Sequence, residues 1–372
     1  MKTTHQIHFR NSNHMEEVPS ESVNLVVTSP PYPMIEMWDE LFSSMSPEIE
    51  NAILNEDGMK AYDLMNEELN KVWKEVDRVM AHGGIVAINI GDATRKIGNT
   101  FQLYANHSRI INCFEKMGYQ VLPAIIWRKQ TNKPNKFMGS GMLPPNAYVT
   151  LEHEYILIFR KSNNRNFNND QKIIRRNSSY FWEERNIWFS DIWMDLKGIS
   201  QKLNNKNLRE RNAAYPFELA YRLINMYSVQ GDFILDPFLG TGTTSMAAAC
   251  LARNSIGYEI DSNFKEVIKP RFQETLKFAE EIVLDRIRDH LDFAAEREKE
   301  KGKLKHLSEN YGFRVVTRQE KNILFQIMRD YKIINENEFE VYYAEHSHDY
   351  GSDSELNIDE TYKKEEKQRK LI

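Results

Sequence analysis

Two short motifs, far apart in the chain, carry the residue types that could do chemistry. The first is Ser29-Pro30-Pro31-Tyr32, directly after the apolar run VNLVVT. A residue that precedes a proline is held extended, and proline itself has a fixed φ and no N–H group. The serine hydroxyl and a proline carbonyl can therefore accept hydrogen bonds from one amino group. The tyrosine ring offers a flat face on which a nucleobase can stack.

The second motif is a glycine-rich turn between an apolar strand and an alanine-rich helix, ILDPFLGTGTTSMAAA. Gly240 and Gly242 allow a tight turn and close approach of a ligand, and the N–H groups at the helix start can hold a carboxylate. Asp236 can bind an ammonium group, and Glu259, at the end of the next strand, can accept hydrogen bonds from ribose hydroxyls. The motif lacks the Lys-Ser/Thr of a phosphate loop and the third glycine of the dinucleotide pattern. It therefore favours a nucleoside with an amino-acid tail, such as S-adenosylmethionine.

Together the two motifs indicate methyl transfer to the amino group of a base. The exocyclic amine of cytosine or adenine is a poor nucleophile, because its lone pair is delocalised into the ring. Two acceptors that hold its hydrogens favour a localised lone pair, so positioning and electrostatics would carry the rate. In a duplex this amine lies inside the base stack, and the base must be flipped out to reach the motif.

These motifs resemble those of the amino-group-specific DNA methyltransferases of bacterial restriction–modification systems. TSPPY precedes DPFLGTGTT, an order similar to that of the permuted β group, and the resemblance covers about residues 23–271. It implies S-adenosyl-L-methionine as cofactor, double-stranded DNA as substrate and a cognate restriction endonuclease as functional partner. It assigns the flipped base to Ser29, Pro30, Pro31 and Tyr32. It assigns the cofactor to Asp236, Pro237, Phe238, Gly240, Gly242, Thr243, Thr244 and Glu259, with Pro216 and Phe217 bordering its methionine end.

The target base stays open between two alternatives. In the family that the motifs resemble, serine in the first position is more usual in cytosine-N4 enzymes, and Asp or Asn in adenine-N6 enzymes, so Ser29 favours cytosine. A third alternative, an inactive DNA-binding module, would be favoured by a degraded cofactor loop, and this loop is intact. Cytosine-C5 chemistry is excluded because it needs a cysteine after a proline, whereas Cys113 follows Asn112 and Cys250 follows Ala249.

The elements that must position the motifs alternate between strands and helices. Strand-like runs are VNLVVT, IVAINIG, YQVLPAIIW, VTLEHEYILIFRK, DFILDP and NSIGYEID, and apolar residues at helical spacing occupy 62–80, 101–118 and 216–228. This alternation predicts an α/β, Rossmann-like fold with a mostly parallel sheet and helices on both faces. We expect a catalytic domain formed by 1–128 and 207–275, an inserted target-recognition region at 129–206, and a mainly helical C-terminal extension at 276–372. Within that extension, 308–334 is expected to form a small helical module.

Charge is segregated along the chain. The 372 residues carry a formal net charge of −5, but Arg128 to Arg211 holds 16 Lys/Arg and 8 Asp/Glu, whereas Glu336 to Glu360 holds nine Asp/Glu and no Lys/Arg. The basic middle segment favours a polyanionic partner.

The remaining composition argues for a cytoplasmic protein without a membrane partner. The apolar runs are too short to span a bilayer, and the N-terminus lacks a signal-peptide core. Two cysteines cannot build a disulfide framework or a cysteine-rich metal site. His346 and His348 could touch a metal, but a disordered acidic tail is the preferred interpretation, and we expect no metal site.

Overall fold

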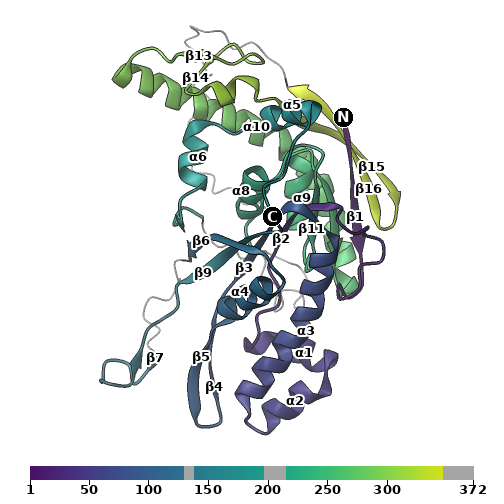
Figure 1. Cartoon of the computed structure of the whole chain (residues 1–372), viewed down its shortest axis with the longest axis vertical. Helices are drawn as coiled ribbons and strands as arrows, with labels where there is room; N and C mark the ends of the chain where they lie inside the picture. Colours follow the sequence, from purple (N-terminus) through teal and green to yellow (C-terminus); the bar gives the residue numbers. More distant parts are fainter. Residues whose placement is uncertain (130–137, 197–214, 347–372) are drawn as a thin grey trace.

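The centre of the protein is a ten-stranded mixed sheet (Figure 1). The computed structural model describes residues 1–129, 138–196 and 215–346. In spatial order the strands are β10 (Ile192–Trp193), β6 (Gln120–Arg128), β9 (His153–Arg160), β3 (Met80–Ile90), β2 (Val23–Thr28), β11 (Phe233–Asp236), β12 (Asn254–Tyr258), β1 (Lys2–His8), β16 (Glu338–His346) and β15 (Phe325–Asn335). The pairings from β3 through β2, β11 and β12 to β1 are all parallel. The predicted α/β fold with a mostly parallel sheet is confirmed.

Helices cover both faces of this sheet. Strands buried on both faces must be apolar along their whole length, and β2 shows why: Leu25 and Val27 belong to one buried cluster and Val26 to the other. The first cluster includes residues of α8 (Phe217–Tyr227), α9 (Thr243–Cys250) and α10 (Lys265–Lys301). The second includes residues of α3 (Gly58–Val79) and α4 (Asn106–Lys116).

Shorter elements complete the described chain. They are η1 (Glu36–Trp38), α1 (Asp39–Met45), α2 (Pro47–Leu54), α5 (Asn169–Asn177), α6 (Trp182–Trp188), η2 (Ser262–Phe264) and η3 (Arg318–Asn322), with the small strands β13 (His306–Leu307) and β14 (Arg314–Val315). None of the helices in this part of the chain is both long enough and apolar enough to cross a membrane.

Both chemical motifs lie at one edge of the sheet. β9 is antiparallel to both β3 and β6, so β6 runs in the same direction as β3, β2, β11 and β12. The carboxyl ends of these strands therefore meet at one edge, where open α/β sheets bind ligands. Two hairpins also leave this edge and project beyond the sheet (Figure 1): β4 (Ala93–Ile97) with β5 (Thr100–Tyr104), and β7 (Met138–Gly139) with β8 (Ala147–Tyr148).

The C-terminal extension differs from the prediction. Its long helix α10 is present, but the expected helical module is wrong, because residues 325–346 form a hairpin of β15 and β16. β16 pairs antiparallel with β1, so the hairpin extends the central sheet at the N-terminal strand. Its apolar residues Met328, Phe339 and Val341 join the core of the catalytic domain. A partner strand at the opposite end of the chain leaves no local signal in the sequence of the hairpin.

Two further expectations concern the edges of elements. Residues 101–104, predicted as the start of a helix, form β5, and the helix α4 begins at Asn106. His346 ends β16, whereas His348 and the rest of the acidic segment 347–372 lie outside the described residues, as do 130–137 and 197–214 of the predicted target-recognition region.

Candidate functional site

One cavity at the carboxyl edge of the sheet joins the two motifs. It encloses about 1140 Å³, its open mouth included. From the first motif, Ser29, Pro30 and Pro31 line it; from the second, Asp236, Pro237, Phe238, Gly240 and Thr243 line it, together with Glu259. Met37 and Trp38, which follow the first motif, form another part of its wall. Residues distant in sequence therefore face a common space large enough for a nucleoside with a side chain.

The glycine-rich turn adopts the conformation that its residues predict. Gly240 has φ 54° and Gly242 has φ 85°, both in the left-handed region that favours glycine. The space beside the Gly240 Cα is open, so a ligand can approach the backbone there. Gly242 is the N-cap of α9, so the free N–H groups of that helix begin at the turn. The turn can therefore receive an anionic group close to the main chain.

Glu259 is held beside the turn by main-chain donors. Its Oε2 accepts from the Gly240 N–H at 2.7 Å, and its Oε1 accepts from the Asp261 N–H at 2.9 Å. Burial raises the pKa of this carboxyl to about 7, although the two main-chain hydrogen bonds oppose the shift. The carboxylate has further lone pairs that can accept hydroxyl hydrogens from a ligand in the cavity.

Asp236 links the two motifs internally. Its Oδ1 accepts from the Thr28 hydroxyl at 2.6 Å and from the Phe238 N–H at 3.1 Å. Its Oδ2 accepts from the Thr244 hydroxyl at 2.6 Å and from the Tyr215 hydroxyl at 3.2 Å. Four donors occupy about all the lone pairs of a carboxylate. Asp236 therefore aligns the end of β2, next to Ser29, with the end of β11, as well as bordering the cavity.

A hydrogen-bonded group that we call the cavity cluster surrounds the first motif: Ser29, Tyr32, Asn89, Lys129 and Glu154. The Tyr32 hydroxyl lies 3.1 Å from Ser29 Oγ and 3.0 Å from Glu154 Oε2. Asn89 Nδ2 donates to Glu154 Oε2 at 2.7 Å and to the Tyr32 oxygen at 2.9 Å. The Lys129 ammonium bonds the other oxygen of Glu154. Three strands thus hold one serine in place: β2 precedes it, β3 carries Asn89 and β9 carries Glu154.

The direction of these hydrogen bonds decides what Ser29 can do. Burial and the neighbouring carboxylate of Glu154 raise the pKa of Tyr32 well above its usual value, so its hydroxyl keeps its hydrogen. That single hydrogen goes to Glu154, because an ionised carboxylate can only accept. The Ser29 hydrogen can then point to the Tyr32 oxygen, which leaves the serine lone pairs for a donor in the cavity.

Sequence reasoning missed Asn89, Lys129 and Glu154. A usable signal existed for Asn89, because it is a polar residue near the carboxyl end of an otherwise apolar strand, IVAINI. Glu154 comes near the start of a strand that runs antiparallel to β3, and no local pattern gives that direction.

Some predicted site residues support the cavity without lining it. Among the described residues, Thr244, Pro216 and Phe217 are absent from its wall. Thr244 is buried against Asp236. Phe217 is buried in the core, and Pro216 is the N-cap of α8, so the residue that faces the cavity is the preceding Tyr215. The predicted border at Pro216 and Phe217 is therefore corrected to Tyr215.

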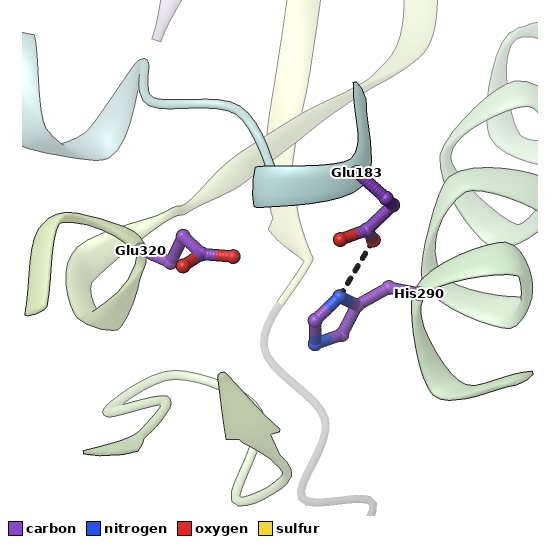
Figure 2. Close-up of side chains that lie close together, drawn as sticks. All are labelled: Glu183, His290 and Glu320. Carbon is purple, nitrogen blue, oxygen red and sulfur yellow. Dashed lines mark hydrogen bonds and ion pairs between the residues drawn. The ribbon is translucent and has the colours of Figure 1, made fainter. Parts of the chain in front are cut away.

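A second polar group lies between α6, α10 and η3, and Figure 2 shows its side chains Glu183, His290 and Glu320. Their ligand-type atoms lie within 4.8 Å of one another. His290 donates from Nδ1 to Glu183 at 2.7 Å and from Nε2 to the Arg314 carbonyl at 3.0 Å. Both ring nitrogens face acceptors, so the ring is an imidazolium. Burial opposes that charge, but the hydrogen bond and the charge of Glu183 raise the pKa of His290.

This arrangement suits an internal ion pair better than a metal, which binds neutral imidazole. Both oxygens of Glu320 accept main-chain hydrogen bonds, from Trp182 and Thr317. The exception is Glu183 Oε2, which is buried without a hydrogen-bond partner among the described residues. Beside it, Glu184 and Arg286 form a bidentate pair at 2.5 and 2.8 Å. We call Glu183, Glu184, Arg286 and His290 the clamp, since they join α6 to α10.

Known proteins share this fold and these motifs. A relative named Type II methyltransferase M.MthZI, from Methanothermobacter thermautotrophicus, is 63% identical over 96% of this chain and 100% of its own length. Type II methyltransferase M.MjaI, from Methanocaldococcus jannaschii, is 52% identical over 72% of this chain and 91% of its own. The structure of a DNA modification methylase from Thermus thermophilus, complexed with S-adenosyl-L-methionine, matches with a TM-score of 0.57 and 30% identity, covering 73% of this chain and 94% of that one.

The family match covers the same part of the chain as the cavity. Residues 23–270 match the DNA methylase family N6_N4_Mtase, and this range begins at β2 and ends within α10. It contains the tetrapeptide, the glycine-rich turn and the three residues that the sequence motifs did not reveal. The chain therefore belongs to the N6_N4 family of DNA methylases.

Proposed function

We propose that this protein transfers a methyl group from S-adenosyl-L-methionine to the exocyclic N4 amino group of a cytosine flipped out of double-stranded DNA. The observation that carries the proposal is the shared cavity: Ser29 of the tetrapeptide and Glu259 of the cofactor half line the same space. A methyl donor and an acceptor base can therefore meet there without a domain movement.

The residues of one half of the cavity fit the cofactor. Gly240 leaves open space beside the main chain, α9 presents its N–H groups to a carboxylate, and Glu259 has lone pairs for ribose hydroxyls. When bound, the cofactor supplies an electrophilic methyl group on a sulfonium. The buried Asp236 keeps this half in register with β2 through Thr28.

The other half fits an amino group. The Ser29 hydroxyl and the carbonyl of Pro30 are acceptors on a stiff backbone, because Pro30 and Pro31 have fixed φ. An amine whose two hydrogens are held by these acceptors presents its lone pair in a defined direction. The cavity cluster fixes the serine through Tyr32, so little reorganisation is needed as the amine becomes positively charged.

Adenine N6 is the alternative target, since its amino group has the same chemistry. Ser29 in the first position of the tetrapeptide supports cytosine, as it does in the family that the motifs resemble. Neither relative described above carries the target base in its name. The experiment that tests the proposal is incubation with methyl-labelled S-adenosyl-L-methionine and mixed-sequence DNA. Label that stays in the cofactor, with wild type no more active than Ser29→Ala, would refute it.

We also propose that methylation is sequence-specific and protects DNA from a cognate restriction endonuclease. The Type II methyltransferase names of the two relatives support this. The basic segment 129–206, which the chain inserts between β6 and α8, is the proposed target-recognition region. Mapping methylated positions in treated genomic DNA tests it, and methylation without a common sequence around the modified base would contradict it.

A further inference from the structure

The hairpin of β7 and β8 carries apolar side chains that no contact within the described part of the protein explains. At its tip, Met142 is 84% exposed and Leu143 is 71% exposed, and Val149 beside β8 is 84% exposed. Large apolar side chains exposed side by side indicate an interaction surface. The tip is also short and ordered by its own main chain, since the Ser140 N–H donates to the Asn146 carbonyl at 2.9 Å.

The hairpin is braced, so its tip has a defined position. Tyr148 of β8 stacks on Phe101 of β5 with ring centroids 4.7 Å apart and an angle of 16° between the planes. This contact joins the two hairpins that project from the sheet edge in Figure 1. Directly after Leu143 come Pro144 and Pro145, whose rings fix φ and stiffen the tip.

The position of the hairpin relative to the cavity indicates its partner. The chain leaves the cavity cluster at Lys129, forms the hairpin, and returns to the cluster at Glu154. A duplex whose base enters the cavity must therefore lie against this edge of the sheet, within reach of the tip.

The charges of this segment also suit DNA. Residues 138–150 carry no charged side chain, and the sequence from 128 to 151 contains no Asp or Glu but includes Arg128, Lys129, Lys133 and Lys136. A polyanion meets no like charge there. A partner protein with an apolar surface would have no need of this basic, acid-free flank.

We propose that Met142 and Leu143 form a wedge that enters the base stack of duplex DNA at the target site and fills the space left by the flipped base. This inference rests on the proposed function. Apolar side chains such as Met and Leu do enter base steps and unstack them in DNA-bending proteins. Flipping costs unstacking and unpairing energy, and this cost is smaller when the target base is already mispaired. The wedge lowers the cost for a paired base.

The test compares a tip variant with a matched surface variant. Met142→Ser with Leu143→Ser removes the wedge, and Ile333→Ser with Ile334→Ser changes two apolar residues of β15 that are 50% and 43% exposed. All four side chains face solvent to a large extent, so both variants are expected to fold. The substrate is a short duplex with the sequence mapped for the wild-type protein, once with the target base paired and once mismatched. Single-turnover methylation is measured on both.

We expect the tip variant to methylate the paired duplex about tenfold or more slowly than wild type, and the mismatched duplex within about twofold of it. The β15 variant should match wild type on both. Equal rates of tip variant and wild type on the paired duplex would overturn the wedge, with the proposed function intact. Equal slowing on both duplexes would also overturn it, since the tip would then contribute contacts and not base opening. A wild type that methylates neither duplex would overturn the proposed function as well.

Discussion

The cavity cluster and the clamp use similar residues for different ends. Each contains a carboxylate in contact with a cation, Glu154 with Lys129 in the cluster and Glu183 with His290 in the clamp. In the cluster the chain of hydrogen bonds ends at Ser29, which lines an open cavity. In the clamp it ends inside the protein, at a histidine with no exposed surface. A chemically suggestive group of side chains thus becomes a site only where one of its members keeps a free valence towards a cavity.

The difference predicts which property each region controls. Loss of a clamp residue leaves a buried charge without a partner and lowers the free energy of unfolding. Loss of a cluster residue changes the orientation of Ser29 and lowers the methylation rate. The predictions below test this separation.

The largest expected effect is on stability. Arg286 is paired with Glu184 and packs over the Phe325 ring at 4.7 Å, so Arg286→Met should lower the free energy of unfolding by about 3–5 kcal/mol. Chemical denaturation measures this. Arg288→Met is the control, since Arg288 pairs with Asp285 at the surface and should cost less than about 1 kcal/mol. A fall in the methylation rate per folded molecule of Arg286→Met would break the separation.

Ser29→Ala should act the other way. It removes one acceptor for the amino group and should lower the methylation rate by about 10²–10³-fold, the effect of removing one preorganised group at a reacting centre. Its thermal unfolding midpoint should stay close to that of wild type. Ser44→Ala, at a surface hydroxyl of α1, serves as the control and should keep full activity. A Ser29→Ala protein with wild-type rates would remove the serine from the mechanism.

Glu154→Gln sharpens the role of the cluster. The change removes a charge that holds Tyr32 and Lys129, and charge-assisted hydrogen bonds of this strength imply a rate lower by about 10- to 100-fold. Since Glu154 acts by positioning, the expected loss is in kcat with a nearly unchanged KM for DNA. Glu152→Gln removes a surface carboxylate paired with Arg128 and is the matched control. Equal losses in both variants would indicate a general charge effect.

The smallest effect concerns pH. Burial raises the pKa of Glu259 to about 7, so this carboxyl gains a proton as pH falls from 8 to 6. Ribose hydroxyls donate to the ionised form, so cofactor affinity should fall by about tenfold between pH 8 and pH 6. Calorimetric titration with S-adenosyl-L-methionine at three pH values measures it. Glu259→Gln should bind weakly with no step near pH 7, and a flat wild-type profile would contradict the assignment.

Much of the catalytic half was predictable because its signals are local. Apolar runs indicated β2, β11 and β12, helical spacing indicated α3 and α8, and the positive φ of Gly240 and Gly242 follows from their residue type. Parallel strands then place the ends of β2 and β11 at one edge by geometry alone.

The errors share a physical cause, which is pairing over long distances in sequence. β16 pairs with β1, so Val341 lies opposite Thr3, and neither segment indicates the other. Glu154 reaches Tyr32 only because β9 runs antiparallel to β3. The border at Tyr215 was missed for a smaller reason: the N-cap of α8 turns Pro216 and Phe217 away from the cavity by one residue.

The central claim is that Ser29 presents an acceptor to the amino group of a cytosine in the shared cavity. Mass spectrometry of the nucleosides released from DNA treated with the protein and S-adenosyl-L-methionine tests it most directly. We predict N4-methylcytosine with wild type and a much smaller amount with Ser29→Ala. N6-methyladenine as the sole product would contradict the assignment to cytosine, and 5-methylcytosine would contradict the amino-group mechanism itself.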